Sequence, residues 1–357
     1  MPELDGWDLL VERNDLTATE LRPAPTPAPG PGEVRLAAET FAMTAITATY
    51  ARLGESELPF FDAFAAPGGH GRVPTWGYAR VEESRHPEIA VGTRYFGFLP
   101  MSTHVVLSAT PTARGFADTA PERDYLHPWY REYLQAGEPD ELDDHRLVLG
   151  PLYPASFNLA EFLIRETAAG GTVLITSASS KTALGLAGLL AAREDLTTIG
   201  VTAPAHADFV RKMRHYDTVL TYGDLSAAEL TGPVVLVDFT GRADRLRAVY
   251  ARFGSVLEDA LLVGYTHPGA EIEPPPGLTD PEPWIFFTPS EELRLIEKEG
   301  EESYRARYRR AEEAFLDTAS QWLTVRRLVG PRALAATHRS LLEGTVPPDT
   351  ATVVSVA

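Results

Sequence analysis

Short apolar runs alternate with helical segments between residues 172 and 265, and this alternation constrains the fold more than any other feature. The apolar runs, rich in Val, Leu and Ile, occupy residues 172–176, 197–201, 217–221, 233–238 and 260–265, and helical segments are predicted near 181–193, 205–214, 225–230 and 242–254. Such runs indicate strands buried on both faces, which is typical of a parallel sheet covered by helices. The pattern therefore predicts an α/β fold with a doubly wound parallel sheet and right-handed crossovers.

The segments on either side of this series have other patterns. Residues 33–110 hold short strand candidates with turn signals and predict a compact β-rich unit, whereas residues 111–150 could form a lid, a dimer contact or a helix packed on the sheet. After the series we expect a sixth strand at 283–290, a solvated charged helix at 291–316, a last helix near 331–343 and a strand at 351–357 that could rejoin the first domain. A length of 357 residues favours two domains.

Composition excludes several classes of function. Fifty acidic residues against 32 basic ones give a formal net charge of -18, a field that repels nucleic acid and anionic lipid. The sequence has no apolar run of roughly 18 residues that could span a membrane and no signal peptide, so a cytoplasmic protein is expected. Because cysteine is absent, a thiolate nucleophile and a cysteine-ligated zinc are excluded.

The turn after the first strand of the series reads Ser177-Ala-Ser-Ser-Lys181, where a dinucleotide-binding fold normally places glycines. Backbone N–H groups and the dipole at a helix N-terminus bind an anion whatever the side chains are. The side chains of this turn and helix start can add donors for a pyrophosphate: Ser177, Ser179, Ser180, Lys181 and Thr182. Gly185 is expected to let the helix pack against the sheet. The alternative is that Ser179 or Ser180 merely caps the helix.

The end of the second strand favours NADPH over NADH. An NAD-specific site normally has an acid here that accepts from the ribose hydroxyls, and none occurs before Asp208. The side chains available near a 2′-phosphate are instead Thr202, His206, Arg211 and Lys212, with Tyr222 closing the third strand nearby. Each of these residues has an ordinary surface position as its alternative.

The later strands end in two polar segments, Asp238-Phe239-Thr240 and Gly264-Tyr265-Thr266-His267. Ligands of a doubly wound sheet lie at this edge. We therefore expect backbone and hydroxyl contacts to the ribose and nicotinamide from Phe239, Thr240, Gly264, Tyr265 and Thr266. Phe287, within Ile285–Thr288, could cover the nicotinamide or simply belong to the sixth strand.

Several motifs in order resemble the medium-chain dehydrogenase/reductase superfamily, in particular its zinc-independent quinone-oxidoreductase and enoyl-reductase branch. "PGPGEVRLAAETFAMTAITATYARLG" resembles the first strands of that family, "VGTRYFGF" one of its turns, and "LLEGTVPPDTATVVSV" its closing helix and strand. The combination of "FAMTA", "WGYA", "PMSTH", "SASSKTALGLA" and "VGYTH" is similar to a bacterial offshoot known mainly as a domain of unknown function. The resemblance covers nearly the whole chain.

This resemblance implies a GroES-like catalytic domain from residues 1–150 and 318–357, and a Rossmann nucleotide-binding domain over residues 151–317. It further implies NADPH as cofactor, a small-molecule substrate and a homodimer joined through the Rossmann sheets. The chain departs from the family in two places. The glycine-rich turn is missing, and Ala45 stands where the family often has an Asn five residues before its active-site Tyr, which puts the substrate chemistry in doubt.

In the resembling family a tyrosine after the second strand can donate a proton, and Tyr50 occupies that place. The alternative is a Tyr that lines a half-polar wall. His70 and His104 could assist as hydrogen-bond partners or acids, or be structural, since nothing in the sequence pairs them with a carboxylate. A zinc site from His70, His104, His127 and Asp62 is not expected, because the spacing shows no convergence. Trp76 and Tyr78 could form an aromatic wall for a flat substrate, or core.

The sequence thus predicts an NADPH-dependent, zinc-independent reductase of an enone, enoyl or quinone-like carbonyl compound. The alternative is a non-redox member of the same fold, either a lyase or isomerase or a ligand-binding biosynthetic partner, that has lost hydride transfer. Ala45 and the glycine-free turn allow this second hypothesis. Substrate identity and stereochemistry do not follow from the sequence.

Overall fold

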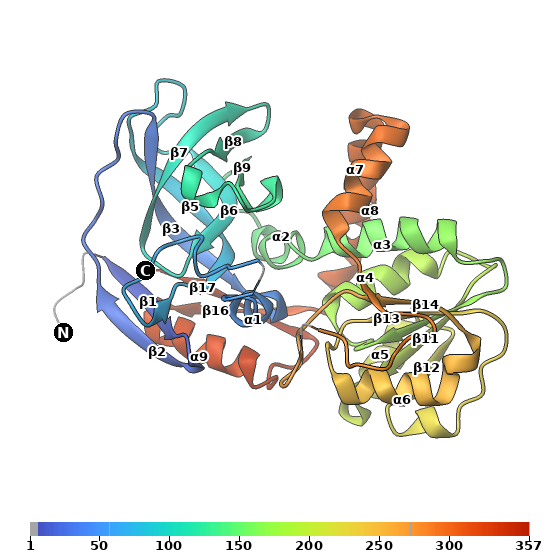
Figure 1. Cartoon of the computed structure of the whole chain (residues 1–357). Coiled ribbons are helices and arrows are strands. Elements are labelled where there is room, and N and C mark those ends of the chain that lie inside the picture. Colours follow the sequence, from blue (N-terminus) through green and yellow to red (C-terminus); the bar gives the residue numbers. More distant parts are fainter. Residues whose placement is uncertain (1–5, 57, 272, 357) are drawn as a thin grey trace. The chain divides into compact units, whose positions relative to one another are not determined.

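A computed structural model describes residues 6–56, 58–271 and 273–356, which divide into two compact units (Figure 1). Unit 1 comprises the described chain up to Val148, Thr324–Val346 and the segment from Thr350 onward; unit 2 comprises Leu149–Leu323 and Pro347–Asp349. Segments from both ends of the chain therefore build unit 1.

The main sheet of unit 1 has eight strands in the order β16-β17-β3-β5-β6-β9-β8-β7. Strand β3 pairs antiparallel with both β5 and β7, so that six of these strands close into a barrel. The eight strands are β3 (Glu33–Met43), β5 (Pro74–Ser84), β6 (Arg94–Pro100), β7 (His104–Thr112), β8 (Gly115–Asp118), β9 (Glu132–Ala136), β16 (Thr324–Val329) and β17 (Thr350–Ser355). As predicted, the last strand rejoins the first domain, because β17 pairs antiparallel with β3.

A second sheet of three strands and several helices complete unit 1. The sheet has the order β2-β1-β4. The elements are β1 (Trp7–Glu12), β2 (Asp15–Pro23), β4 (His70–Gly71), α1 (Ala45–Arg52), α9 (Gly330–Leu342), the 3₁₀ turns η1 (Pro121–Arg123) and η2 (Pro128–Tyr130), and α2 (Asp143–Leu149), which leads into unit 2. Residues 111–150, which the sequence left undecided, thus form two strands, two 3₁₀ turns and one short helix.

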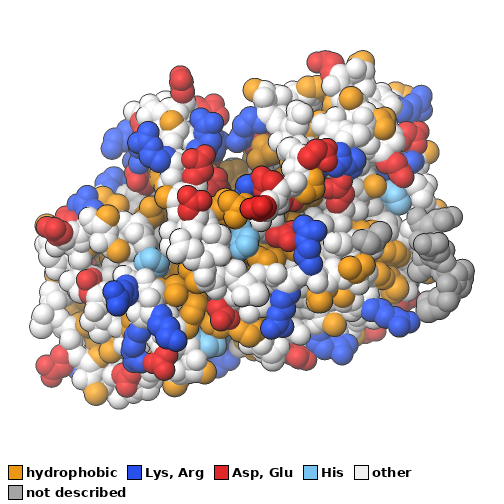
Figure 2. All heavy atoms as spheres, turned by 180° about the vertical axis from the view of Figure 1, so that it is seen from behind, with side chains coloured by type: hydrophobic (Ala, Val, Ile, Leu, Met, Phe, Trp, Pro, Cys, Tyr) orange, Lys and Arg blue, Asp and Glu red, His pale blue; other side chains and the backbone are white. Residues whose placement is uncertain are grey.

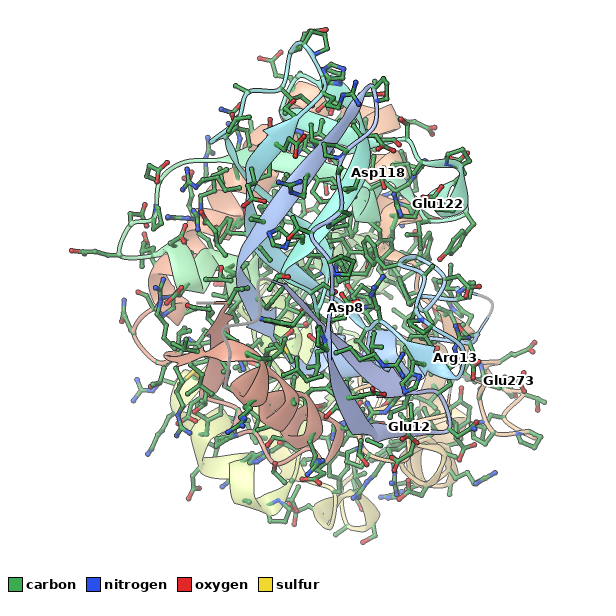
Figure 3. All side chains as sticks on the ribbon, turned by 90° about the vertical axis from the view of Figure 1, so that its left-hand side faces the viewer. Asp8, Glu12, Arg13, Asp118, Glu122 and Glu273 are labelled. Carbon is green, nitrogen blue, oxygen red and sulfur yellow. The ribbon has the colours of Figure 1, made fainter. Side chains whose placement is uncertain are left out.

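Ion pairs hold loops of unit 1 against its strands; Asp118 and Glu122, two of the acids involved, are labelled in Figure 3. The Arg123 guanidinium pairs with the buried carboxylate of Asp118 at the end of β8 and lies 3.3 Å from that of Glu122. It also donates to the carbonyl oxygen of Ala63 at 3.2 Å. Since Arg123 is itself only 7% exposed, these charge-assisted bonds fix the segment before η2 against the loop that contains Ala63.

Unit 2 contains a six-stranded sheet in the order β12-β11-β10-β13-β14-β15, in which every pair is parallel. The strand order reverses direction between β10 and β13, as in dinucleotide-binding folds. The strands are β10 (Thr172–Thr176), β11 (Thr197–Thr202), β12 (Thr218–Thr221), β13 (Val234–Asp238), β14 (Leu257–Leu262) and β15 (Trp284–Ile285). The doubly wound sheet predicted from the apolar runs is confirmed.

Alternate residues of each central strand pack on opposite layers of helices. Val173 and Ile175 join one core with helix residues such as Leu159 and Leu186, whereas Leu174 joins another with α6 residues such as Val249. Both faces are therefore buried, which explains the continuous apolar runs. The helices of unit 2 are α3 (Tyr153–Glu166), α4 (Lys181–Leu190), α5 (Ala207–Met213), α6 (Ala243–Phe253), α7 (Thr288–Glu299) and α8 (Glu301–Ala319), with the 3₁₀ turns η3 (Pro204–His206), η4 (Asp224–Ser226) and η5 (Gly254–Val256).

Three predicted elements of unit 2 are wrong in extent. The helix expected at 225–230 is only η4, because the chain turns at Gly232, which has a φ of +82°, ahead of Pro233 and β13. The strand expected at 283–290 ends at Ile285, because Pro289 lies in the first turn of α7, where proline favours a helix start. The charged helix expected at 291–316 is two helices, divided at Gly300 with a φ of +85°.

Elements that the sequence did not predict include α1, α3, β1, β2 and β16. Helix α3 also corrects the role expected for Gly185. A Cβ on that glycine would lie 2.7 Å from the Ser156 hydroxyl oxygen of α3, so the missing side chain admits a neighbouring helix rather than the sheet.

No single helix among the described residues is long and apolar enough to cross a membrane; α2 and α3 meet the length and composition criteria only when they are taken together.

His338 of α9 makes the stability of unit 1 sensitive to acid. Its side chain is fully buried, and one ring nitrogen, Nε2, lies 3.0 Å from the carbonyl oxygen of Leu16, to which it can donate. Burial lowers the pKa of His338; the Leu16 carbonyl opposes this effect and the charge of Arg52 adds to it. The unfolded chain therefore binds this proton more readily than the folded chain below about pH 6.5.

We expect the melting temperature to fall between pH 7 and pH 5 less steeply in His338→Gln than in the wild type. Glutamine keeps an N–H donor for Leu16 but has no proton to bind. Thermal unfolding at a series of pH values measures the difference, and the other histidines contribute equally to both proteins. Equal slopes would contradict this role for His338.

Candidate functional site

The carboxyl ends of five parallel strands bring most of the predicted nucleotide site to one edge of the unit 2 sheet. The register pairs Thr176 of β10 with Val201 of β11, Thr202 with Thr221 of β12, and Asp238 of β13 with Leu262 of β14. The residues that follow each strand therefore leave the sheet at the same edge, which is the ligand-binding edge of doubly wound folds.

The turn after β10 contains a residue with a left-handed backbone conformation, and that residue is a serine rather than a glycine. Ser177 has a φ of +49°, a conformation that costs a residue with a Cβ on the order of 1 kcal/mol. Three hydrogen bonds hold the turn: Ser177 N–H donates to the Tyr222 hydroxyl oxygen at 3.0 Å, Ala178 N–H to the Val201 carbonyl at 3.0 Å, and Ser180 N–H to the Ser177 carbonyl at 2.8 Å. Serine can therefore take the backbone path that glycine normally takes here, because neighbouring strands stabilise it.

The serines of the turn have different partners. Ser180 is the N-cap of α4, and its hydroxyl accepts from Ala183 N–H at 3.2 Å, which confirms the capping interpretation for this residue. The hydroxyl of Ser179 lies 3.2 Å from His206 Nδ1 and accepts from the Thr202 hydroxyl at 3.3 Å. Ser179, Thr202 and His206, which were predicted as site residues, thus meet beside the start of α4. Thr182 lies in the first turn of that helix.

Tyr222 lies at the base of this cluster together with a residue that the sequence did not indicate. The Arg245 guanidinium lies 4.0 Å from the centroid of the Tyr222 ring, a cation–π contact. Burial raises the pKa of Tyr222 to about 12, so the phenol is neutral and keeps its own proton. Arg245 is in the first turn of α6, where the helix dipole disfavours a cation; that unusual position is the one signal that could have singled it out.

Two basic residues expected at the phosphate site have other partners. Arg211 forms an exposed ion pair with Asp208 at 3.0 Å. Asp208 is the first acidic residue after β11, so this acid and the predicted phosphate ligand Arg211 are paired with each other. The ammonium of Lys181 donates to the carbonyl oxygen of Pro348 at 3.2 Å. This corrects the expectation that Lys181 presents its charge to a pyrophosphate. Its stem lies at the helix start, but its Nζ contacts the Pro347–Asp349 segment of the same unit.

The hydroxyls expected to contact ribose and nicotinamide are largely bonded within the protein. Thr240 donates to the Asp238 carboxylate at 2.8 Å, and Thr266 donates to the carbonyl oxygen of Phe239 at 3.0 Å. Phe239 and Tyr265 are buried, and a Cβ on Gly264 would come within 3.2 Å of the Phe239 carbonyl oxygen. These residues therefore shape the edge of the sheet rather than offer free hydroxyls.

Asp238 is the centre of this arrangement, a role the sequence did not reveal. Its fully buried carboxylate accepts from Thr176 at 2.5 Å, from Thr240, and from Gly241 N–H at 2.8 Å. Burial raises the pKa of Asp238, and these hydrogen bonds oppose the rise. The ends of β10 and β13 are thereby joined through one carboxyl group.

Phe287 precedes α7 as its N-cap and is 40% exposed. It belongs neither to the sixth strand, which ends at Ile285, nor to the buried edge of the sheet. A role in covering a nicotinamide stays a prediction.

The candidate proton donor, Tyr50, lies in unit 1, in the last turn of α1. Its hydroxyl oxygen accepts from Trp76 Nε1 at 2.9 Å, and its ring lies 6.0 Å from that of Tyr130, centroid to centroid. The ring packs on Phe60 and Phe98 at centroid distances of 4.8 and 5.0 Å. Burial raises the pKa of Tyr50 well above the usual value of a phenol.

The two residues predicted to line a substrate wall are both buried. Trp76 stacks on Phe96, with centroids 5.3 Å apart and an interplanar angle of 12°. One face of Tyr78 is covered by Arg94 at 3.7 Å, and the Arg94 guanidinium forms a two-point ion pair with Asp143 at 2.8 and 3.0 Å. Tyr78 therefore belongs to the core of unit 1, which is one of the two alternatives that the sequence left open.

Both histidines considered as acids do have a carboxylate partner, which corrects the expectation from sequence. His70 Nε2 lies 3.1 Å from Glu20, and His104 Nε2 lies 3.3 Å from Glu82. The pKa of His104 is lowered by burial, although Glu82 acts in the opposite sense. His127 accepts from Trp129 N–H as the cap of η2. Among the described residues, no three His, Asp or Glu side chains form a group that could hold a metal ion.

Lys181 gives unit 2 a stability that rises with pH. Burial lowers its pKa to about 8, while Asp349 opposes the shift. Between about pH 8 and the ordinary value near 10.5 the unfolded chain therefore binds more protons than the folded chain, so this group adds stability as the pH rises through that window.

We expect Lys181→Met to reduce this rise in melting temperature between pH 8 and pH 10. Ionising tyrosines affect both proteins alike, so the difference isolates the lysine. Lys212→Met, at an exposed position of α5, is the matched control and should keep the wild-type profile. An unchanged profile in Lys181→Met would show that its ammonium is not held in a buried position.

The chain resembles several solved structures over nearly its whole length. CurA from Vibrio vulnificus matches with a TM-score of 0.66 at 15% identity, covering 99% of both chains. CurA from the same organism in complex with NADPH has a TM-score of 0.64 at 15% identity, covering 98% of this chain and 99% of that one. Mycobacterial Rv1454c complexed with NADPH has a TM-score of 0.57 at 18% identity, covering 98% of this chain and 100% of that one.

At these identities the likeness establishes the fold, and the predicted architecture of a GroES-like β-rich domain and a Rossmann domain is confirmed. No curated protein matches the chain. A family model described as "Protein of unknown function (DUF2855)" matches residues 41–347, in agreement with the offshoot indicated by the sequence motifs. The chain therefore belongs to the DUF2855 family.

Proposed function

We propose that this protein binds NADPH at the carboxyl edge of the unit 2 sheet and reduces a conjugated carbonyl compound, an enone, an enoyl compound or a quinone, without zinc. The fold supports the proposal, and two structures of that fold, CurA and Rv1454c, were solved with NADPH. The quinone oxidoreductase from Coxiella burnetii shares the fold at a TM-score of 0.56 and 15% identity, covering 99% of both chains.

The chemistry of the helix start fits a pyrophosphate. The left-handed turn at Ser177 leads into α4 through Ser179 and Ser180, and Thr182 follows in the first turn. Amide groups and the dipole at such an end attract an anion, and hydroxyls can donate to it. We therefore assign the pyrophosphate to this end of α4, with the Lys181 ammonium left on the Pro348 carbonyl.

The observation that supports the proposal most strongly concerns the choice between NADPH and NADH. Strand β11 ends at Thr202, and the first acid after it, Asp208, is paired with Arg211. A free carboxylate for the ribose hydroxyls of NAD is therefore missing from the 203–210 segment. Arg245 on Tyr222, by contrast, adds a guanidinium suited to a phosphate. We assign the 2′-phosphate to Thr202, His206, Tyr222 and Arg245.

NADPH, when bound, supplies the hydride for the reduction. The protein then has to hold the acceptor, polarise its carbonyl and supply one proton. The tyrosines and tryptophan of unit 1 suit a flat, conjugated molecule better than a charged one, because their surroundings are aromatic. The acidic net charge of -18 also disfavours strongly anionic partners, although acidic and basic side chains are interspersed on the surface shown in Figure 2.

We expect Arg245→Ala to weaken NADPH binding at least tenfold, which is about 1.4 kcal/mol, and to leave NADH binding within twofold. The guanidinium would contact only the 2′-phosphate, so the loss should be specific to NADPH. Arg247→Ala, two residues further along α6 and exposed, is the control. Titration calorimetry with both nucleotides measures the two affinities. Equal losses of affinity for NADPH and NADH would refute the assignment.

Turnover separates the reductase from the non-redox alternative. We expect loss of absorbance at 340 nm when the wild type is mixed with NADPH and a panel of enones and quinones. NADPH binding without such a loss would favour a lyase, an isomerase or a ligand-binding partner on the same fold. A protein that binds no NADPH would refute the proposal as a whole.

A homodimer and a cytoplasmic location complete the proposal. The edge strand β15 exposes Trp284 and Ile285, at 40% and 52%, and an exposed apolar strand edge favours pairing with another chain. Native mass spectrometry of the full chain should show twice the monomer mass of 38.9 kDa.

A further inference from the structure

Strand β16 forms one end of the eight-stranded sheet of unit 1 and has an open edge (Figure 1). It pairs in parallel with β17 through six consecutive residues, from Thr324 beside Thr350 to Val329 beside Ser355. On its other side, no strand of the described chain pairs with it. The backbone N–H and C=O groups that face this side are therefore available to a further strand.

This edge is continuous and exposed. Five of the six residues of β16 are exposed, among them Leu328 at 39% and Val329 at 65%. The sheet of unit 2 ends in shorter strands, β12 with four residues and β15 with two. The sequence of β16 also contains no proline that would interrupt a ladder of hydrogen bonds. The strand can therefore offer backbone partners over its whole length to an extended segment of another chain.

The charge of the edge comes from Arg326. This residue is exposed, and its side chain forms no ion pair or hydrogen bond with a described residue. The neighbouring Arg327 lies on the opposite face of the strand, where its guanidinium forms a two-point ion pair with Asp144 of α2 at 2.5 and 2.7 Å. Arg327 is therefore paired within the protein, whereas Arg326 places an unpaired cation beside the open backbone edge.

The two arginines disfavour a second copy of β16 as the partner. In a fully overlapping antiparallel pair of two β16 strands, Arg326 of each copy lies opposite Arg327 of the other. Moving one strand by a single residue sets Arg326 opposite Arg326, or Arg327 opposite Arg327, depending on the direction. Like charges directly opposite each other destabilise a sheet. The charge that prevents pairing of like edges favours a strand with an acidic side chain instead.

We propose that the β16 edge binds an acidic, extended segment of another protein, which adds to the sheet as a further strand. Backbone hydrogen bonds supply the ladder, and a carboxylate opposite Arg326 supplies the charge pair. The net charge of -18 does not prevent a short acidic segment from binding, because physiological salt screens exposed charges beyond about 8 Å. Binding at this edge needs no nucleotide and is independent of the reductase activity.

The test measures binding of the full chain to the fluorescein-labelled peptide Val-Thr-Glu-Glu-Val-Thr-Val by fluorescence polarisation, with Val-Thr-Lys-Lys-Val-Thr-Val as its basic counterpart. Successive side chains of a strand point to opposite faces, so one of the two acids lies on the face of Arg326 in either orientation of the peptide. We expect the acidic peptide to bind about tenfold more tightly than the basic one. No binding of the acidic peptide at about 1 mM, where even a weak complex forms, would overturn the proposal.

Arg326→Glu reverses the charge of the edge. We expect it to weaken binding of the acidic peptide about fivefold and to strengthen binding of the basic peptide by a similar factor, because the cross-strand charge pair changes sign. Arg85→Glu is the matched control, since Arg85 is exposed in unit 1 just after β5 and its reversal changes the net charge equally. Thermal melting confirms that both variants fold. Equal effects of the two variants on peptide binding would overturn the proposal.

Two N-methylated forms of the acidic peptide distinguish strand addition from simple charge attraction. Only alternate N–H groups of a strand face its neighbour, so one form is methylated at its even-numbered residues and the other at its odd-numbered internal residues. One form should bind within about threefold of the parent peptide, and the other at least about tenfold more weakly, because it lacks the donors of the ladder. Equal affinities of the two forms would overturn strand addition.

Native mass spectrometry of Arg326→Glu tests the other occupant. We expect the variant to keep the oligomeric state of the wild type, because no second copy binds at this edge. A change in that state would assign the edge to a second copy of the chain and overturn the proposal.

Discussion

The buried carboxylate of Asp238 is the interaction on which the candidate cofactor site depends. It accepts hydrogen bonds from Thr176 at the end of β10 and from Gly241 N–H after β13, and the Thr176 hydroxyl in turn accepts from Phe239 N–H at 3.1 Å. These bonds join the two central strands where the sheet reverses direction. Because Ser177 follows Thr176 directly, its left-handed turn starts from a fixed point, and α4 begins where the turn directs it.

Position 177 has a serine where this fold normally has a glycine, and hydrogen bonds to neighbouring strands hold its backbone. A left-handed serine costs energy that glycine would not, and the structure offsets this cost with bonds from the turn to Tyr222 and to β11. Other polar groups at this edge of the sheet, which the sequence assigned to a ligand, also bond within the protein. Thr240, Thr266 and Lys181 all hydrogen-bond to protein atoms. Arg245 on Tyr222 gains importance for that reason.

The two units illustrate which features a sequence can predict. The first five strands of the parallel sheet of unit 2 were predicted within a few residues, because strands buried on both faces give continuous apolar runs. Its errors fall where single residues override a pattern: Gly300 divides a charged stretch that reads as one helix, and Pro289 starts a helix inside an apparent strand. In unit 1 the strands differ in length, from two residues in β4 to eleven in β3 and β5, and α1 lies in a stretch for which the sequence predicted no helix.

The sequence by itself determined the fold class, the family and the location of the candidate cofactor site, because the alternation of strands with helices and the start of α4 follow from local patterns of apolar residues and serines. Only the tertiary structure decided which side chains are free to act. The His70 ring meets the Glu20 carboxylate, and the Tyr50 hydroxyl oxygen accepts from Trp76, across segments far apart in the chain. Hydrogen-bond partners of this kind depend on how strands and loops pack in three dimensions, and the spacing of residues along a chain does not encode them.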